Sequence, residues 1–423
     1  MSEIKTYTIK PGITLHHIDT NQFKTVSVGL HFHRQLKKNE AALNALLTDV
    51  MQRGNSKLKD TAAISRYLQA LYGAYFDADI RRKGEDQILS YVISTVSDEY
   101  LPEGEQCVLK AVSMLFDMVL CPQIENGAFR ADYVEQEKVN LINDIEALIN
   151  DKRSYAVWRL VENMCDGDPY SIYELGRVED VKAITPKMLY DHYQTVLQES
   201  PVDIFVTGKA DIDAIIETTK ERFADISPDV LTYPKTTLYR PSNTMKQIEE
   251  VFDVTQAKLS MGFYTGIAPD DARYSALMVF NSIFGSGAHS KLFNNVREKL
   301  SLCYYASSRL ERYKGIMLVS SGIESQNKQK AEDEILLQLD AIKNGDISDY
   351  EFDVSVKSII NSLRSMRDSN GYLADYYLGQ VVSGTNISLE EQCRLISGVT
   401  KEDVVKVAQE IKPEMVYFMK GEA

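Results

Sequence analysis

The sequence predicts an α+β protein made of two homologous domains, each a mixed or antiparallel sheet with flanking helices. Two observations indicate this fold. A strand-like segment near the start recurs past the midpoint, and the elements after it recur in the same order. The offset between the copies is roughly 215–230 residues, much longer than a solenoid period, which indicates a duplicated domain. Two such halves are expected to face each other as a clamshell around a cleft.

Each half opens with a strand of alternating apolar and polar residues, followed by a helix that ends near a glycine, as helix C-termini commonly do. The strands are residues 24–33 and 257–264, the helices are 40–51 and 272–284, and the glycines are Gly54 and Gly285.

The later elements also repeat: a short helix, a turn and strand, a long helix, and a final helix that leads into a strand. They are expected at 64–71, 83–94, 132–149 and 184–206, and again at 292–300, 314–321, 349–367 and 399–418. Between the halves, residues 227–248 hold three prolines in a polar stretch that cannot sustain a helix. We therefore expect a domain at 1–226, a linker at 227–248 and a second domain at 249–423.

The composition excludes several classes of protein. Of 423 residues, 44% are hydrophobic and 26% are charged, which is typical of globular proteins. The formal net charge of −14 argues against binding to nucleic acid or to an anionic membrane. Five scattered cysteines indicate neither a disulfide framework nor a thiolate zinc site. The first residues contain no signal peptide, and the longest apolar stretch, 111–120, is too short to span a bilayer, so a cytoplasmic protein is expected.

Two neighbouring segments of the second half resemble the pitrilysin/insulinase family of zinc peptidases, in its short two-domain type. Residues 285–293 read Gly-Ser-Gly-Ala-His-Ser-Lys-Leu-Phe, and residues 296–304 read Val-Arg-Glu-Lys-Leu-Ser-Leu-Cys-Tyr. They are similar to the family's glycine-rich loop and its Arg-Glu-(Lys)-x-Gly-Leu-x-Tyr signature, with Ser301 at the position of the usual glycine. The resemblance is collinear over essentially the whole chain and is closest to small bacterial members.

The resemblance implies a zinc motif, His-x-x-Glu-His, on the first helix, and these positions are occupied here by Ala45, Thr48 and Asp49. A pair of glutamates on the long helix downstream corresponds to Glu137 and Asp144. Zinc takes three protein ligands, preferably with nitrogen or thiolate donors, and a threonine is no base near neutral pH. We therefore expect no metal and no other cofactor in this chain, and no peptide hydrolysis by the chain alone.

A count of histidines gives the same answer without an alignment. The six are His16, His17, His31, His33, His192 and His289. No two stand four positions apart, so no zinc motif of either orientation is present.

Two weaker metal hypotheses stay open beside their plainer alternatives. His31 and His33 share a strand face, where they could hold a metal with a nearby carboxylate or be surface or interface histidines. Asp49, Glu137 and Asp144 could hold a hard divalent cation or line a vestigial polar pocket.

The resemblance also implies roles for Arg297 and Tyr304, which in the family bind the substrate backbone and stabilise the oxyanion across the cleft. Both side chains can donate hydrogen bonds to developing negative charge. The alternative is a helix-surface arginine and a half-buried strand tyrosine. Gly285, Ser286 and Gly287 are expected to form a substrate-binding loop, or else a helix cap and a turn that needs positive φ.

The resemblance implies the non-catalytic subunit of a heteromeric zinc peptidase, because the family includes pairs in which one subunit keeps the metal site and the other keeps the Arg/Tyr pair. A zinc-bearing paralogue would supply the metal and the base, and this chain would bind the peptide substrate and supply Arg297 and Tyr304. Peptides would add a strand to an exposed sheet edge. The alternative is a proteolytically inactive peptide-binding or scaffold protein with no catalytic partner. Without the paralogue, the sequence is compatible with a monomer and with a homodimer. A self-sufficient hydrolase finds no support, because no Gly-x-Ser-x-Gly elbow is present and Cys303 has no adjacent base.

Overall fold

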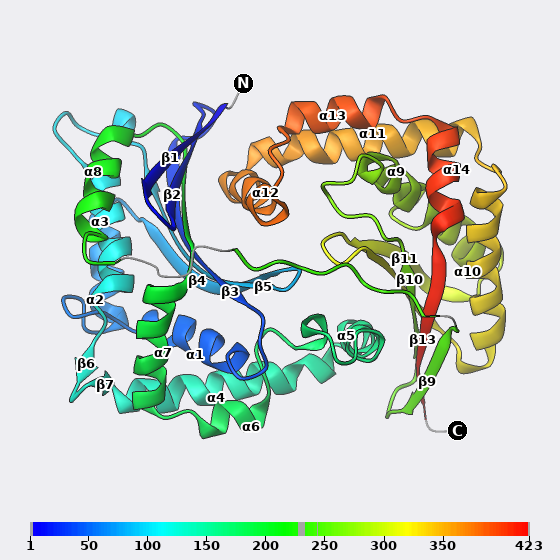
Figure 1. Cartoon of the computed structure of the whole chain (residues 1–423), viewed down its shortest axis with the longest axis horizontal. Coiled ribbons are helices and arrows are strands. Elements are labelled where there is room, and N and C mark those ends of the chain that lie inside the picture. Colours follow the sequence, from blue (N-terminus) through cyan, green and yellow to red (C-terminus); the bar gives the residue numbers. More distant parts are fainter. Residues whose placement is uncertain (1–2, 227–232, 243, 422–423) are drawn as a thin grey trace. The chain divides into compact units, whose positions relative to one another are not determined.

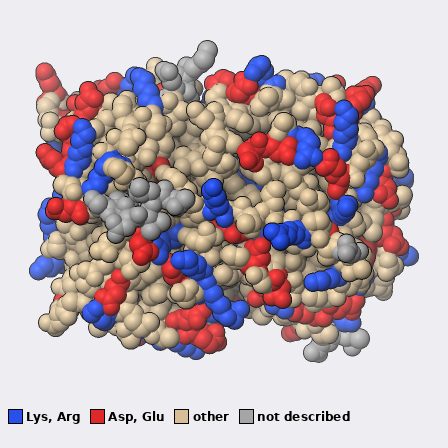
Figure 2. All heavy atoms as spheres, in the orientation of Figure 1, with Lys and Arg blue, Asp and Glu red and all other residues tan. Residues whose placement is uncertain are grey.

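The computed structural model describes residues 3–226, 233–242 and 244–421 (Figure 1). The chain divides into two compact units. The first comprises Met1–Glu146, Ile172–Lys235 and Arg367–Val382, and the second comprises Ala147–Ser171, Thr236–Met366 and Ser383–Ala423. Within the described ranges, no helix combines the length and apolarity needed to cross a membrane. On the face drawn in Figure 2, acidic and basic side chains are interspersed rather than gathered by sign.

The first unit is built on a six-stranded sheet in the order β1-β2-β8-β3-β5-β4. Its strands are β1 (Glu3–Lys10), β2 (Ile13–Asp19), β3 (Thr25–Gln35), β4 (Tyr75–Lys83), β5 (Asp86–Val96) and β8 (Val202–Thr207). All neighbours are antiparallel except β2 and β8, which are parallel. A separate hairpin pairs β6 (Ile124–Glu125) with β7 (Ala128–Phe129).

The second unit is built on a five-stranded sheet in the order β11-β12-β10-β13-β9. Its strands are β9 (Lys246–Val251), β10 (Ala257–Tyr264), β11 (Cys303–Glu311), β12 (Ile316–Ile323) and β13 (Lys412–Lys420). The order β4-β5-β3-β8-β2 of the first sheet matches β11-β12-β10-β13-β9, and in both the last pair alone is parallel. The two sheets share one topology, which confirms the predicted duplication and the α+β class.

The helices follow the duplication as well. In the first half of the sequence they are α1 (Ala41–Met51), α2 (Thr61–Ala70), α3 (Cys107–Leu120), α4 (Ala131–Ala147), α5 (Lys152–Met164), α6 (Val178–Ala183), α7 (Pro186–Glu199) and α8 (Ile212–Arg222). In the second half they are α9 (Tyr274–Phe284), a π-helix (Leu292–Lys299), α10 (Lys328–Lys343), α11 (Asp349–Ser365), α12 (Asn370–Ser383), α13 (Leu389–Ser397) and α14 (Lys401–Glu410). Short 3₁₀ turns lie at Asp98–Tyr100, Leu148–Asn150, Pro169–Ser171, Ser325–Asn327 and Met366–Asp368.

Local sequence accounts for where the final helix of each half begins. Thr185 caps α7 by accepting the amide of Met188, and Pro186 occupies the first helical position, where its missing N–H costs nothing. Thr400 caps α14 in the same way and forms a reciprocal capping box with Asp403. Both strands that follow, β8 and β13, are buried along most of their length.

Each unit contains one helix from the other half of the sequence. The second unit contains α5, whose buried Leu160 and Met164 pack with β12 and β13 side chains such as Leu318 and Tyr417 in one apolar cluster. The first unit contains α12, whose Asp375 pairs with Lys83 of β4 at 2.8 Å. Sequence halves and compact units therefore differ by one helix each.

The predicted linker at 227–248 lies only partly within the described residues, because 227–232 and 243 fall outside them. Residues 233–242 form neither helix nor strand, and β9 begins at Lys246. The domain limits 1–226 and 249–423 stay a prediction.

Candidate functional site

The helix that corresponds to the family's zinc helix is α1, and its three motif positions offer no metal-binding nitrogen. Ala45 and Thr48 are buried, and the Thr48 hydroxyl donates to the Asn44 carbonyl oxygen at 2.9 Å. Asp49 is the only one of the three that can ionise. Burial, together with the negative charges of Glu137 and other nearby carboxylates, raises the pKa of Asp49 to about 7.

The carboxylate that would lie beside a metal, that of Glu137, already forms an ion pair with an arginine. Arg53 places Nη1 3.1 Å from Glu137 Oε1, and its Nη2 donates to Gln136 Oε1 at 2.6 Å. The other Glu137 oxygen accepts the Asn140 amide at 2.9 Å. Among the described residues, no group of three or more His, Cys, Asp or Glu side chains is placed to hold a metal ion. The residues present therefore do not fit a zinc ion.

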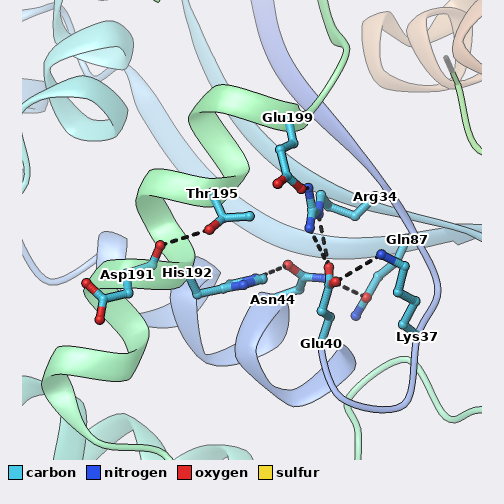
Figure 3. Close-up of polar contacts among 9 residues, drawn as sticks. All are labelled: Arg34, Lys37, Glu40, Asn44, Gln87, Asp191, His192, Thr195 and Glu199. Atoms are coloured by element: carbon cyan, nitrogen blue, oxygen red, sulfur yellow. Dashed lines mark hydrogen bonds and ion pairs between the residues drawn. The ribbon is translucent and has the colours of Figure 1, made fainter. Parts of the chain in front are cut away.

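A buried polar network holds the start of α1 in place (Figure 3). His192 of α7 donates through Nε2 to Asn44 Oδ1 at 2.7 Å, and Asn44 donates through Nδ2 to Gln87 Oε1 at 2.8 Å. Arg34 and Glu40 form an ion pair of 2.5 Å at the same end of the helix. Burial lowers the pKa of His192 to about 4, so the imidazole is neutral and committed to Asn44. This network could not be predicted from the sequence because its members lie far apart in the chain, with His192 and Asn44 separated by 148 positions.

His31 and His33 share one face of β3 as expected, but both have protein partners. His33 places Nδ1 2.5 Å from Asp86 Oδ2 and Nε2 3.0 Å from Asp203 Oδ2. Burial opposes a charge there, yet the two carboxylates outweigh it and raise the pKa of His33 to about 10. His31 Nδ1 lies 2.9 Å from Ser90 Oγ, and burial lowers the pKa of His31 to about 3. His33 is thus a buried imidazolium, which has no lone pair for a metal.

Arg297 lies on the π-helix, a rare geometry that occurs often at functional sites. The wide turns are visible where the Leu300 N–H donates to the carbonyl of Asn295, five residues back, at 3.2 Å. The Arg297 guanidinium lies 4.7 Å from the Phe293 ring centroid, and its ion pair with Glu298 is long, at 3.5 Å. With 41% of its side chain exposed, Arg297 keeps N–H donors available to a ligand.

Tyr304 is the second residue of β11 and is 64% exposed. The pairing of β11 with β12 shifts register between Cys303 and Tyr305, so Tyr304 is the extra residue of a β-bulge. Bulges often redirect a side chain next to a functional site. Tyr304 is thus a strand residue, as the plainer alternative has it, but it is exposed and not half-buried. Its role toward a substrate stays a prediction.

Arg297 and Tyr304 line the same cavity, which has a volume of about 400 Å³. The whole lining belongs to the second unit. It consists of Arg297, Glu298, Ser301, Leu302, Cys303, Tyr304 and Glu324. A cavity of this size lies within the range of ordinary ligand sites.

Ser301, at the position of the family's glycine, adopts a left-handed backbone with φ of 51°. Glycine reaches this region without steric cost, whereas a residue with a Cβ pays about 1 kcal/mol or more. Ser301 therefore differs from the glycine of the signature in its side chain, but it keeps a backbone conformation that favours glycine. The chain turns at Ser301 from the π-helix into β11 and so connects Arg297 to Tyr304.

The glycine-rich loop packs beside β11. Gly285 caps α9 with φ of −152°, so the expected positive φ is wrong for this residue. Glycine is needed there for space, because a Cβ would lie 2.7 Å from the Ser308 nitrogen, and the Ser308 N–H donates to the Gly285 carbonyl at 3.0 Å. Gly287 does have positive φ, at 139°, with the His289 ring against it. Ser286, between them, is exposed.

The family description "Peptidase M16 inactive domain" matches residues 183–359. The chain is 35% identical over 410 residues to the Bacillus subtilis protein named "Probable inactive metalloprotease YmfF", covering 97% of this chain and 96% of that one. The chain belongs to the pitrilysin/insulinase, or M16, family of peptidases. It is a homologue of the inactive type, in line with the groups found on α1.

Solved structures share this fold over essentially the whole chain. A conserved protein from Enterococcus faecalis V583 superposes with a TM-score of 0.92 at 30% identity, covering 100% of this chain and 99% of that chain. A peptidase M16 inactive domain from Pseudomonas fluorescens superposes with a TM-score of 0.81 at 18% identity. The match covers 99% of this chain and 98% of that chain. The second likeness shows the shared fold alone. The predicted family and its short type are confirmed.

Proposed function

We propose that this M16 chain is the non-catalytic subunit of a heteromeric peptidase, in which a zinc-bearing paralogue supplies the metal and the base. The observation that carries the proposal is that Arg297 and Tyr304, the family's predicted pair, line one cavity while α1 offers no zinc ligands.

The chemistry assigned to this chain is electrostatic. The Arg297 guanidinium and the Tyr304 hydroxyl would donate hydrogen bonds to the carbonyl oxygen of the peptide and to the negative charge that develops on it. Donors of this kind, fixed before the reaction, typically contribute about 3–4 kcal/mol each to the transition state. The long Arg297–Glu298 pair, at 3.5 Å, leaves N–H donors of the guanidinium available to a substrate.

Peptide binding would use the edge of the second sheet. β11 is an edge strand, so its outward amides and carbonyls can pair with an added strand. The Ser308 N–H on that edge is already bonded to Gly285. An added peptide would therefore lie along the part of β11 before Ser308, next to Tyr304, with the 285–287 loop at its end.

The test mixes the full chain with a paralogue from the same organism that keeps the His-x-x-Glu-His motif, and measures cleavage of a quenched fluorescent peptide library. Turnover should exceed that of either protein alone. Arg297→Ala and Tyr304→Phe should each reduce it about a hundredfold or more. Matched controls are Arg394→Ala, with 76% of the side chain exposed on α13, and Tyr350→Phe, 68% exposed on α11.

The rival function is a peptide-binding or scaffold protein with no catalytic partner. It predicts peptide binding without turnover in any mixture. If the mixture cleaves no faster than the paralogue alone, or if Arg297→Ala behaves like Arg394→Ala, the proposal of shared catalysis is wrong and the rival stands.

A further inference from the structure

The glycine-rich loop, residues 285–291 before the π-helix, contains a histidine whose partners lie on two different helices. His289 Nε2 is 3.1 Å from Ser282 Oγ of α9 and 3.0 Å from Ser355 Oγ of α11. Both serines are buried. A single ring nitrogen therefore joins the loop to two helices that pack under it.

The protonation state of the ring decides whether both contacts can form. A neutral ring with its proton on Nδ1 has a lone pair on Nε2 that can accept from both hydroxyls, whereas an N–H at Nε2 points at one hydroxyl at a time. Burial lowers the pKa of His289 from its ordinary 6.5, which favours the neutral ring at neutral pH.

Few charged groups face His289. The sequence of α9 contains no charged residue. From α11, the negative charge of Glu351 opposes the effect of burial on the pKa of His289 but does not outweigh it. Lys291 of the loop lies 2.9 Å from Glu351 and offsets part of that charge. The loop is thus held on α11 at two positions one turn apart, Glu351 and Ser355.

The loop is bonded to both elements that carry the candidate site. Asn294 of the π-helix donates through Nδ2 to the His289 carbonyl oxygen at 3.0 Å, and this helix carries Arg297. At the other end of the loop, the Gly285 carbonyl accepts the N–H of Ser308 from β11, the strand that carries Tyr304. A change in the position of the loop is therefore transmitted to both side chains.

We propose that His289 is a positioning residue for the site of Arg297 and Tyr304: its neutral ring ties the glycine-rich loop to α9 and α11 together, and protonation frees the loop from one of them. The effect on turnover rests on the proposed function, whereas the tie itself belongs to this chain alone. The contribution of the neutral ring is complete above about pH 6.5 and is lost as the pH falls below that value.

The experiment measures hydrogen exchange of the full chain by mass spectrometry between pH 4.5 and pH 8, with rates corrected for the exchange of free amides at each pH. The amides of 286–290 are the readout. The amides of β12, which is buried and contains no ionisable side chain, are the internal reference. Relative to β12, exchange of the loop should be about three- to tenfold faster at pH 4.5 than at pH 8, as for the loss of one or two hydrogen bonds.

Two substitutions of His289 separate its charge from its contacts. His289→Gln keeps an acceptor that takes up no proton, so exchange of the loop should stay slow at every pH. His289→Ala removes both contacts, so exchange should be fast at every pH. If His289→Gln keeps the pH dependence of the wild type, or if His289→Ala leaves the loop unchanged at pH 8, the Lys291–Glu351 pair alone holds the loop and the proposal is overturned.

The serine contacts have a matched control. Ser355→Ala should speed exchange of the loop about threefold at pH 8. Ser397→Ala removes an exposed hydroxyl of α13, which donates to the Cys393 carbonyl, and should leave the loop unchanged. Equal effects of the two substitutions overturn the tie to α11. Thermal unfolding of each variant at pH 8 separates a local change in the loop from a loss of fold.

The positioning role and shared catalysis fail separately. In an active mixture with the paralogue, the wild type should lose more kcat/KM between pH 8 and pH 5 than His289→Gln, and equal losses mean that His289 does not position the site. If exchange of the loop depends on His289 but no mixture gives turnover, the tie stands and shared catalysis is wrong. If turnover requires Arg297 but exchange of the loop is indifferent to His289, shared catalysis stands and the tie is wrong.

Discussion

Asp49 occupies the position of a lost zinc ligand, and its replacement by asparagine should stabilise the protein above neutral pH. Asn keeps the shape of the side chain and removes the charge. The pKa of Asp49 rises from its ordinary 3.8 to about 7, first because the group is buried and then because Glu137, Asp144 and Asp79 lie near it. The folded protein therefore holds a proton that the unfolded chain releases, and stability falls as the pH rises from about 4 to 7.

The size of the effect follows from the shift. A rise of the pKa from 3.8 to about 7 corresponds to at most about 4 kcal/mol. The side chain is only partly buried and its charge is shared among coupled carboxylates, which reduces the expected gain to about 2 kcal/mol at pH 8. At pH 5 the gain should be less than half of that, because Asp49 is still protonated in the folded state.

Urea denaturation of the wild type and Asp49→Asn between pH 5 and pH 8 measures both values. Asp353→Asn, an exposed position of α11, is the matched control and should leave the pH dependence unchanged. The reasoning is refuted if Asp49→Asn shows the same pH dependence as the wild type, or if it is less stable at pH 8.

Three further substitutions test the geometry. His33→Gln should cost about 3–5 kcal/mol because two buried carboxylates lose their shared partner. The stability that the His33 proton gives the wild type is complete below about pH 6.5 and is lost as the pH rises from there to about 10, the folded pKa, so a denaturation series from pH 6 to pH 10.5 should show this loss in the wild type and not in the variant. Ser301→Gly should raise the free energy of unfolding by about 0.5–1 kcal/mol, since glycine accepts a φ of 51° without strain, and an unchanged denaturation midpoint would count against that strain. Gly285→Ala should cost about 1–3 kcal/mol by driving a methyl group against Ser308 of β11, and calorimetry with no drop in the melting temperature would contradict the close packing.

Much of the fold could be predicted because local pattern and duplication reinforce each other. The alternation over 257–264 predicts β10 with the bounds that the structure has, and the prediction of β3 at 24–33 is correct to within two residues. Because each predicted element occurs in both halves of the sequence, the second copy gave independent support for the first. The loss of the zinc site could also be predicted, because a count of histidines depends on no contact in space.

The parts that could not be predicted depend on long-range contacts. The partners of His33 come from β5 and β8, and the pairing of His192 with Asn44 joins α7 to α1. No spacing in the sequence indicates either. The sequence also does not show why residue 285 must be glycine. A side chain there would collide with Ser308, which lies on a strand later in the chain. The sequence also does not indicate that Ser301, at the position of the family's glycine, adopts a left-handed backbone.

The exchange of α5 and α12 has a consequence for how the protein breaks apart. Cutting the chain within residues 233–242, which form no helix or strand, would yield two fragments, each carrying a helix that completes the other's compact unit. The nicked protein should therefore run as one particle under native conditions, and the two pieces, produced separately, should each be unstable and recover their structure only when mixed.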